Sequence, residues 1–224
     1  MITLDNKNRY LQIAFNYNAA MVRRILPHIP TAPNIFIEAG TPYIKREGMA
    51  GVRLIRRLWM GVVVADMKIA DGAMDEVRMT KLAGANAITC LGSAPTETLD
   101  LFIETCEKFD MLSMVDLIGV GDPLKILRPL KKAPKVVVLH RGRDEELSSR
   151  NKMIGYRHIN RIHSKFDSLI SVAGGVDIKE SRSAIFNGAN IVVANLVNPG
   201  DGWVGISTGS EVSKSAQNFL NTIA

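Results

Sequence analysis

The sequence predicts an α/β fold, a (β/α)8 or TIM barrel built as a single domain. Short apolar segments alternate with segments of helical periodicity eight times along 224 residues, which favours parallel strands joined by right-handed helical crossovers. Eight such units in this length indicate a compact closed barrel, slightly shorter than the usual ~250 residues. No low-complexity linker interrupts the alternation, so we expect one domain over residues 1–224.

The first units follow the expected local signals. Residues 11–15 form an apolar strand, and the helix over 19–26 ends at Pro27, which cannot continue it. The second strand covers 34–38, and a helix follows over about 48–59. A dinucleotide-binding open sheet is the alternative fold, but the G-x-G-x-x-G signature that should follow its first strand is missing here.

The middle of the chain repeats the same pattern. Four small, mostly β-branched residues precede Asp66 and form the third strand, and the helix over 74–82 is closed by Gly84. The following strands are expected at residues 85–91, 111–117 and 135–140, and the helices between them at 96–108 and 123–130.

The last units complete the count of eight. A long polar helical region is expected over 145–163, before a strand at 169–173 and a helix at 178–186. The eighth strand covers 190–194 and the closing helix 212–223. Between them lies an atypical loop at 195–210.

Composition limits the possible functions. No apolar run approaches the ~20 residues needed to cross a bilayer, and the first residues lack the layout of a secretory signal, so we expect no membrane partner. Cys90 and Cys106 make no disulfide framework and favour a cytoplasmic protein. The net charge of +6 is scattered without interleaved aromatic residues, which argues against nucleic acid. A phosphorylated small molecule needs only a few local charges.

Reactive side chains follow most of the expected strands, at the end where barrel enzymes place their active sites. They are Asn16, Glu38, Asp66, Lys68, Asp116, His140 and Arg143, with Gly174 and Gly175 after the seventh strand. The opposite strand ends are mostly uncharged, with Lys135 an exception. We interpret this asymmetry as an active site.

The third strand ends in the most distinctive of these groups, with Asp66, Lys68 and Asp71 in a D-x-K-x-x-D run. The ordinary interpretation is an ion pair in a loop. The alternative is an amine that neighbouring carboxylates keep protonated and that faces an anion forming on a substrate.

Four segments carry a family resemblance. They are Glu38-Ala-Gly-Thr-Pro42, Asp66-Met-Lys-Ile-Ala-Asp71, Val115-Asp-Leu-Ile-Gly119 and Ser171-Val-Ala-Gly-Gly175. Together they resemble the orotidine 5′-monophosphate decarboxylase superfamily, over about residues 11–194. Within it, the chain is most similar to the 3-hexulose-6-phosphate synthases and the 3-keto-L-gulonate-6-phosphate decarboxylases.

The resemblance implies a Mg²⁺ ion that Glu38 and Asp66 hold on neighbouring oxygens of a sugar phosphate. The metal and Lys68 would share the charge of an enediolate while a C–C bond forms or breaks. His140 would move a proton on the substrate or on the carbonyl of formaldehyde, and Asp116 would hold a nearby hydroxyl or water.

The resemblance also implies a homodimer with shared active sites, because Asp71 would reach into the neighbouring subunit. The backbone N–H groups of Gly174 and Gly175 would hold the phosphate, since glycine lets the backbone approach an anion closely. The backbone at Asn195 and Leu196 is expected to contribute to the same phosphate site.

Three positions distinguish the two subgroups. Asp116 and Ala173 resemble the synthase, whereas the decarboxylase tends to have Glu and Thr there. Arg143 resembles the decarboxylase, whose arginine helps direct proton delivery. Two positions against one favour a synthase-type aldolase that adds formaldehyde to ribulose 5-phosphate, reversibly. The decarboxylase, and a barrel that binds a sugar phosphate without turning it over, remain the alternatives.

Two departures from the family pattern bear on this choice. Asn16 stands where the family usually has Asp, which removes a negative charge near Lys68. After the eighth strand, Ala194-Asn-Leu-Val197 replaces the common Gly-Arg or Gly-Gly. The segment around Trp203 is either a lid over the site or a packing element, and we favour the lid.

Overall fold

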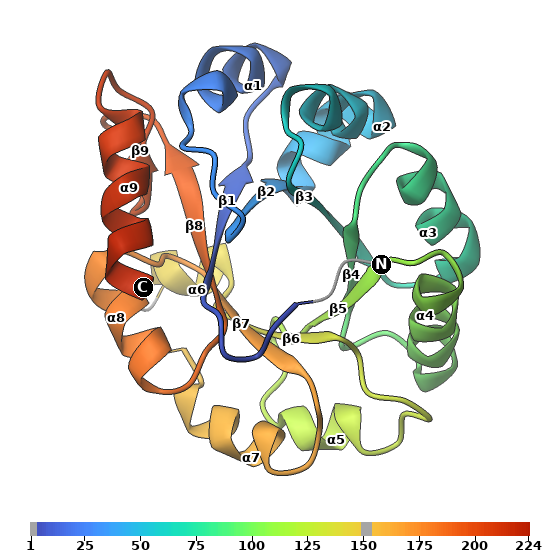
Figure 1. Cartoon of the computed structure of the whole chain (residues 1–224). Coiled ribbons are helices and arrows are strands. Elements are labelled where there is room, and N and C mark those ends of the chain that lie inside the picture. Colours follow the sequence, from blue (N-terminus) through green and yellow to red (C-terminus); the bar gives the residue numbers. More distant parts are fainter. Residues whose placement is uncertain (1–3, 149–153) are drawn as a thin grey trace.

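The computed structural model describes residues 4–148 and 154–224, and its eight parallel strands form a closed ring (Figure 1). Each strand pairs with the next along the chain, and β1 pairs with β8 to close the barrel. The strands are β1 Tyr10–Phe15, β2 Ile35–Ala39, β3 Val62–Ile69, β4 Ala87–Leu91, β5 Leu112–Asp116, β6 Val136–His140, β7 Leu169–Ala173 and β8 Ile191–Val197. The predicted (β/α)8 barrel is therefore confirmed.

Most of the helices surround this ring and bury apolar side chains against its outer surface (Figure 1), whereas α6 (Arg143–Ser148) buries no side chain and contributes Arg143 and Glu146 to the cavity at the strand ends. The helices are α1 Ala19–Ile25, η1 Leu26–His28, α2 Thr41–Leu58, α3 Ala73–Leu82, α4 Thr96–Lys108, α5 Pro123–Leu127, α6 Arg143–Ser148, η2 Tyr156–His158, α7 Ile159–His163, α8 Ile178–Phe186 and α9 Val212–Ile223. Within the described ranges, none combines the length and hydropathy that a bilayer crossing requires.

The barrel interior is apolar toward the N-terminal ends of the strands and polar toward their C-terminal ends. Successive side chains of a strand point to opposite faces of the sheet, so every second residue points inward. The interior near the N-terminal strand ends is filled by an apolar cluster that includes Tyr10, Phe36, Val62, Leu112, Val136, Leu169 and Ile191. Polar residues occupy the inward positions nearer the C-terminal strand ends, and they form the candidate site.

Two helices differ from the sequence expectation. α2 begins at Thr41 rather than near residue 48, because Pro42 fits the first turn of a helix, where its missing N–H costs nothing. Gly48, with φ of 58°, instead marks a kink inside this helix.

The polar region expected over 145–163 is also divided. α6 begins at Arg143 and ends at Ser148, while η2 and α7 lie over 156–163. Residues 149–153 lie outside the described part of the chain.

β8 ends at Val197 rather than at residue 194, so the expected loop over 195–210 begins at residue 198 instead. That loop contains one unexpected element. The short strand β9, Ile206–Ser207, pairs in parallel with Leu196 and Val197 of β8. This pairing returns the chain to the barrel before α9 begins.

Candidate active site

A cavity opens at the C-terminal ends of the strands, and nearly all of the polar residues predicted from the sequence line it. Those that line it are Asn16, Glu38, Asp66, Lys68, Asp116, His140, Arg143, Gly174, Gly175 and Asn195. Asp71 and Leu196 are not among the lining residues. Asp71 is exposed, and Leu196 is buried beside β9.

An irregularity in β3 places Lys68. The pairing of β3 with β4 shifts register between Ala65 and Ile69, and Lys68 has a left-handed φ of 52°, which is unusual for a residue with a side chain. Its backbone N–H donates to the Oγ1 atom of Thr89 on β4, at 2.9 Å. Backbone strain of this kind is characteristic of functional sites.

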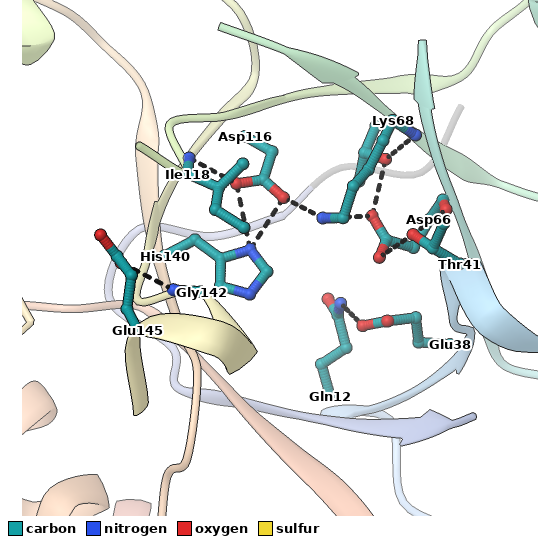
Figure 2. A network of polar contacts seen from close by, with 11 residues as sticks. Gln12, Glu38, Thr41, Asp66, Lys68, Asp116, Ile118, His140, Gly142 and Glu145 are labelled. Carbon is teal, nitrogen blue, oxygen red and sulfur yellow. Dashed lines mark hydrogen bonds and ion pairs between the residues drawn. The ribbon is translucent and has the colours of Figure 1, made fainter. Parts of the chain in front are cut away.

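The ammonium group of Lys68 lies between two carboxylates (Figure 2). Its Nζ atom is 3.2 Å from Oδ1 of Asp66 and donates a short hydrogen bond to Oδ2 of Asp116. Burial alone would lower the pKa of Lys68, but the charges of Asp66 and Asp116 outweigh burial and raise it above its usual value. Lys68 therefore stays protonated at neutral pH.

Asp116 joins Lys68 to His140. The Nδ1 atom of His140 is 2.8 Å from Oδ2 of Asp116, and the backbone N–H of Ile118 donates to Oδ1 at 3.0 Å. Burial opposes ionisation of Asp116, but His140 and Lys68 outweigh it and lower its pKa to about 2. Burial also lowers the pKa of His140, and the charge and hydrogen bond of Asp116 reverse this and raise it.

Two threonines fix the carboxylate of Asp66. Thr41 donates to its Oδ2 atom at 2.7 Å, and Thr89 donates to its Oδ1 atom at 2.8 Å. Thr89 therefore holds both ends of the Asp66–Lys68 pair, since its oxygen also accepts the backbone N–H of Lys68.

Glu38 lies buried beside this group. Burial first, and then the charge of Asp66, raise the pKa of Glu38 to about 7. Gln12 of β1 donates to its Oε2 atom at 2.5 Å. Two nearby carboxylates whose charges repel provide hard oxygen ligands for a divalent cation, so Glu38 and Asp66 fit a Mg²⁺ ion that keeps several waters. Among the described residues, no group of three or more metal-binding side chains occurs.

The expected phosphate end of the cavity is built around the turn after β7. Gly174 and Gly175 have φ of 101° and 60°, and a side chain at Gly174 would collide with the backbone oxygen of Arg141. The guanidinium of Arg141 donates to the carbonyls of Gly174 and Gly175, at 2.9 and 3.2 Å. The carboxylate of Glu146 lies against Gly175.

The two departures from the family pattern contact each other. The side chain of Asn16 donates to Oδ1 of Asn195 at 3.0 Å, across the seam where β1 and β8 close the barrel. Two hydrogen-bonded amides thus stand where the family pattern would place the carboxylate of an aspartate at position 16.

The segment after β8 covers one side of the cavity. Trp203 lines it, and the guanidinium carbon of Arg143 is 4.0 Å from the centre of the Trp203 ring, close enough for a cation–π contact. The same segment is fixed at its base, because the hydroxyl of Tyr17 donates to Asp201 and accepts the backbone N–H of Asn198. These contacts place the segment at the cavity, and its role as a lid stays a prediction.

Sequence reasoning missed five residues of the site: Gln12, Thr41, Thr89, Arg141 and Glu146. Gln12 and Thr89 carried a usable signal, because each is polar at an inward position of an otherwise apolar strand. The others depend on contacts between distant segments.

Comparison with known proteins shows which sequences and structures the chain is similar to. Residues 9–195 match the family model described as "Orotidine 5'-phosphate decarboxylase / HUMPS family". The "Bifunctional enzyme Fae/Hps" of Methanothrix thermoacetophila is 39% identical over 216 residues, which cover 96% of this chain and 52% of that protein. The chain thus spans about half the length of the curated relatives it matches.

Solved structures agree in fold. The 3-hexulose-6-phosphate synthase from Salmonella typhimurium has a TM-score of 0.80 at 22% identity and covers 96% of this chain and 98% of its own. A second structure, titled "Crystal Structure of 3-Hexulose-6-Phosphate Synthase", has a TM-score of 0.76 at 26% identity, over 96% and 100% of the two chains.

Removing the hydroxyl of Thr89 should destabilise the fold. Thr89→Val leaves the N–H of Lys68 without its acceptor and removes one of the donors to Asp66, so we expect the free energy of unfolding to fall by about 1–3 kcal/mol. Thr89→Ser should restore most of this loss. Thr80→Val is the matched control, because Thr80 is also buried and its hydroxyl donates to the sulfur of Met49 at 3.9 Å, a weak acceptor. Chemical denaturation measures all three, and equal losses in the two valine variants would contradict the assigned role.

Neutralising Asp116 should lower the pKa of His140. In the native protein this pKa lies above 6.5, because Asp116 outweighs burial. In Asp116→Asn burial dominates, and we expect His140 to titrate below 6.5. NMR titration of the four histidines tests this, with His140→Gln to assign the signal. An unchanged pKa would show that Asp116 does not control His140.

Proposed function

The chain belongs to the orotidine 5′-phosphate decarboxylase / HUMPS family, and from this premise we propose that it is an aldolase of the 3-hexulose-6-phosphate synthase type. It would add formaldehyde to ribulose 5-phosphate, reversibly. The observation that carries the proposal is the ammonium of Lys68, held between Asp66 and Asp116 beside His140 at the mouth of a closed barrel.

The relatives named Fae/Hps support the synthase, although the chain spans only about half of their length. Arg143 lines the cavity and stacks on Trp203, so its position keeps the decarboxylase as the alternative. The retained charges of Lys68, Asp66 and Asp116 argue against a barrel that only binds its ligand.

Glu38 and Asp66 would hold a Mg²⁺ ion. When bound, this ion would supply a Lewis acid for neighbouring oxygens of the sugar phosphate. Burial first, and then the charge of Asp66, raise the pKa of Glu38, and a bound cation would lower it again.

Protein side chains would supply the rest of the mechanism. Lys68 cannot lose its proton easily, so it would stabilise the negative oxygen of the enediolate while the new C–C bond forms. Asp116 engages Nδ1 of His140 and leaves Nε2 to exchange a proton with the substrate and with the carbonyl oxygen of formaldehyde. The phosphate would lie at Gly174 and Gly175, at the opposite side of the cavity.

A homodimer would complete the site. Asp71 is exposed and does not line the cavity of its own chain. Apolar side chains lie exposed on the two helices that follow it, Met74 on α3 at 53% and Leu101 on α4 at 39%. We propose that this surface joins two copies, with each Asp71 reaching the partner's cavity. A cytoplasmic location, consistent with the two free buried cysteines, stays a prediction.

Incubation with ribulose 5-phosphate, formaldehyde and Mg²⁺ tests the activity directly. We expect formaldehyde consumption, and Lys68→Ala should reduce it by about 10²- to 10³-fold because a preorganised cation is lost. Lys165→Ala, an exposed lysine away from the cavity, should retain the activity. If the protein instead released carbon dioxide from 3-keto-L-gulonate 6-phosphate and consumed no formaldehyde, the decarboxylase would replace the synthase.

Mixing two inactive variants tests the shared site. In a heterodimer of Lys68→Ala and Asp71→Ala, one cavity receives both an intact Lys68 and the partner's intact Asp71. Random exchange should therefore restore about a quarter of the sites. Lys68→Ala mixed with His140→Ala is the control, since both residues line one cavity and no intact site can form. Heterodimers without recovered activity would show that Asp71 serves no neighbouring site.

A further inference from the structure

Gln12 is a buried polar residue to which the proposed mechanism gives no role. It lies in the middle of β1, between the inward-facing Tyr10 and Ala14 that belong to the apolar interior. Its side chain is 3% exposed and lines the cavity. A polar side chain at such a position is costly unless both ends of its amide are satisfied.

Only one end of that amide has a protein partner. The Nε2 atom donates to Oε2 of Glu38 at 2.5 Å. This contact fixes the orientation of the amide when Glu38 is ionised, the form that would hold a cation, because an ionised carboxylate only accepts. The Oε1 atom is buried and has no hydrogen-bond partner among the residues that the structure describes. An acceptor left in this state costs about 1–3 kcal/mol, so its position points to a ligand that donates.

None of the neighbouring donors among the described residues reaches Oε1 of Gln12. Lys68 donates to Asp116 and pairs with Asp66, and Nδ1 of His140 faces Asp116. Figure 2 shows the amide of Gln12 pointing into the space that Lys68, His140 and Glu38 surround. A molecule in that space is therefore the source of a donor for Oε1.

We infer that Gln12 determines specificity: its Oε1 atom accepts a hydrogen bond from a substrate hydroxyl, while its Nε2 atom holds Glu38 in place. This inference rests on the proposed sugar-phosphate function and adds to it a residue that recognises one hydroxyl of the sugar. The oxygens at C1 and C2 of ribulose 5-phosphate become the enediolate, which Lys68 faces. The hydroxyl that donates to Gln12 is therefore the one at C3 or C4.

A site built in this way discriminates strongly. A pocket that hydrogen-bonds a substrate hydroxyl rejects the analogue that lacks it, because the buried acceptor is then left unpaired. Gln12 would thus exclude deoxy sugars and favour a polyhydroxylated chain.

Binding of ribulose 5-phosphate and of its 3-deoxy and 4-deoxy analogues tests the inference. Calorimetry without formaldehyde, with and without Mg²⁺, gives a dissociation constant for each compound and requires no turnover. We expect the wild-type protein to bind one deoxy analogue about tenfold or more weakly, in line with the cost of an unpaired buried acceptor. In Gln12→Met, which keeps the volume and removes the amide, this difference should disappear for that analogue alone.

Ser171→Ala is the matched control. Ser171 on β7 is also fully buried and its hydroxyl has no partner among the described residues, but it does not line the cavity. Its removal should leave the preference for the hydroxyl unchanged. Gln12→Asn, which withdraws the amide, replaces the methionine variant if circular dichroism shows that the latter is unfolded.

The outcomes separate this inference from the proposed function. Formaldehyde consumption together with an unchanged hydroxyl preference in Gln12→Met would overturn the inference alone and show that Oε1 only binds water. A Gln12-dependent preference without formaldehyde consumption would overturn the aldolase and support the inference. If the wild-type protein bound no ribulose 5-phosphate, both would fail.

Discussion

The candidate site depends on one ionic arrangement, the ammonium of Lys68 between the carboxylates of Asp66 and Asp116. Asp66 lies in the second half of β3 and Asp116 ends β5, so the arrangement exists only when these two strands have the correct relative height in the closed ring. Breaking one partner of such a buried group leaves an uncompensated charge. The same constraint extends to His140, which shares Asp116 with Lys68. In the proposed mechanism, proton transfer by His140 and charge stabilisation by Lys68 would therefore be coupled through one carboxylate.

The strained backbone at Lys68 follows from this requirement. A regular β3 would point residue 68 along the alternating pattern of the strand and would pair its N–H with β4. The structure instead turns Lys68 into a left-handed conformation and gives its N–H to the side chain of Thr89. The free-energy cost of this backbone conformation is small compared with the stabilisation from apolar packing inside the barrel. The fold can thus hold a functional residue in a conformation that a lysine rarely adopts.

Much of this organisation could be predicted from the sequence, because the barrel is encoded locally. Short β-branched strands such as 136–140 and the periodic helix α4 carry their own signals, and the closed ring then brings Glu38, Asp66, Asp116 and His140 to one end. Helix boundaries were harder to predict, because a proline such as Pro42 is typical of a loop but also fits the first turn of a helix.

Features that depend on distant contacts could not be predicted. Thr89 donates to Asp66 and accepts the backbone N–H of Lys68. Both hydrogen bonds depend on the register shift between β3 and β4, which no local pattern encodes. The pairing of Asn16 with Asn195 joins opposite ends of the chain, so the two departures from the family pattern looked independent in the sequence and are one contact in the structure.

The placement of the tryptophans gives the molecule a built-in optical probe. The chain has two: Trp59 is packed in the core, while Trp203 faces the cavity beneath the guanidinium of Arg143. Indole emission depends on the polarity and the charges around the ring. Fluorescence from Trp59 therefore provides a constant background, and any change in colour or intensity when the cavity fills originates at Trp203, without a dye or an added label.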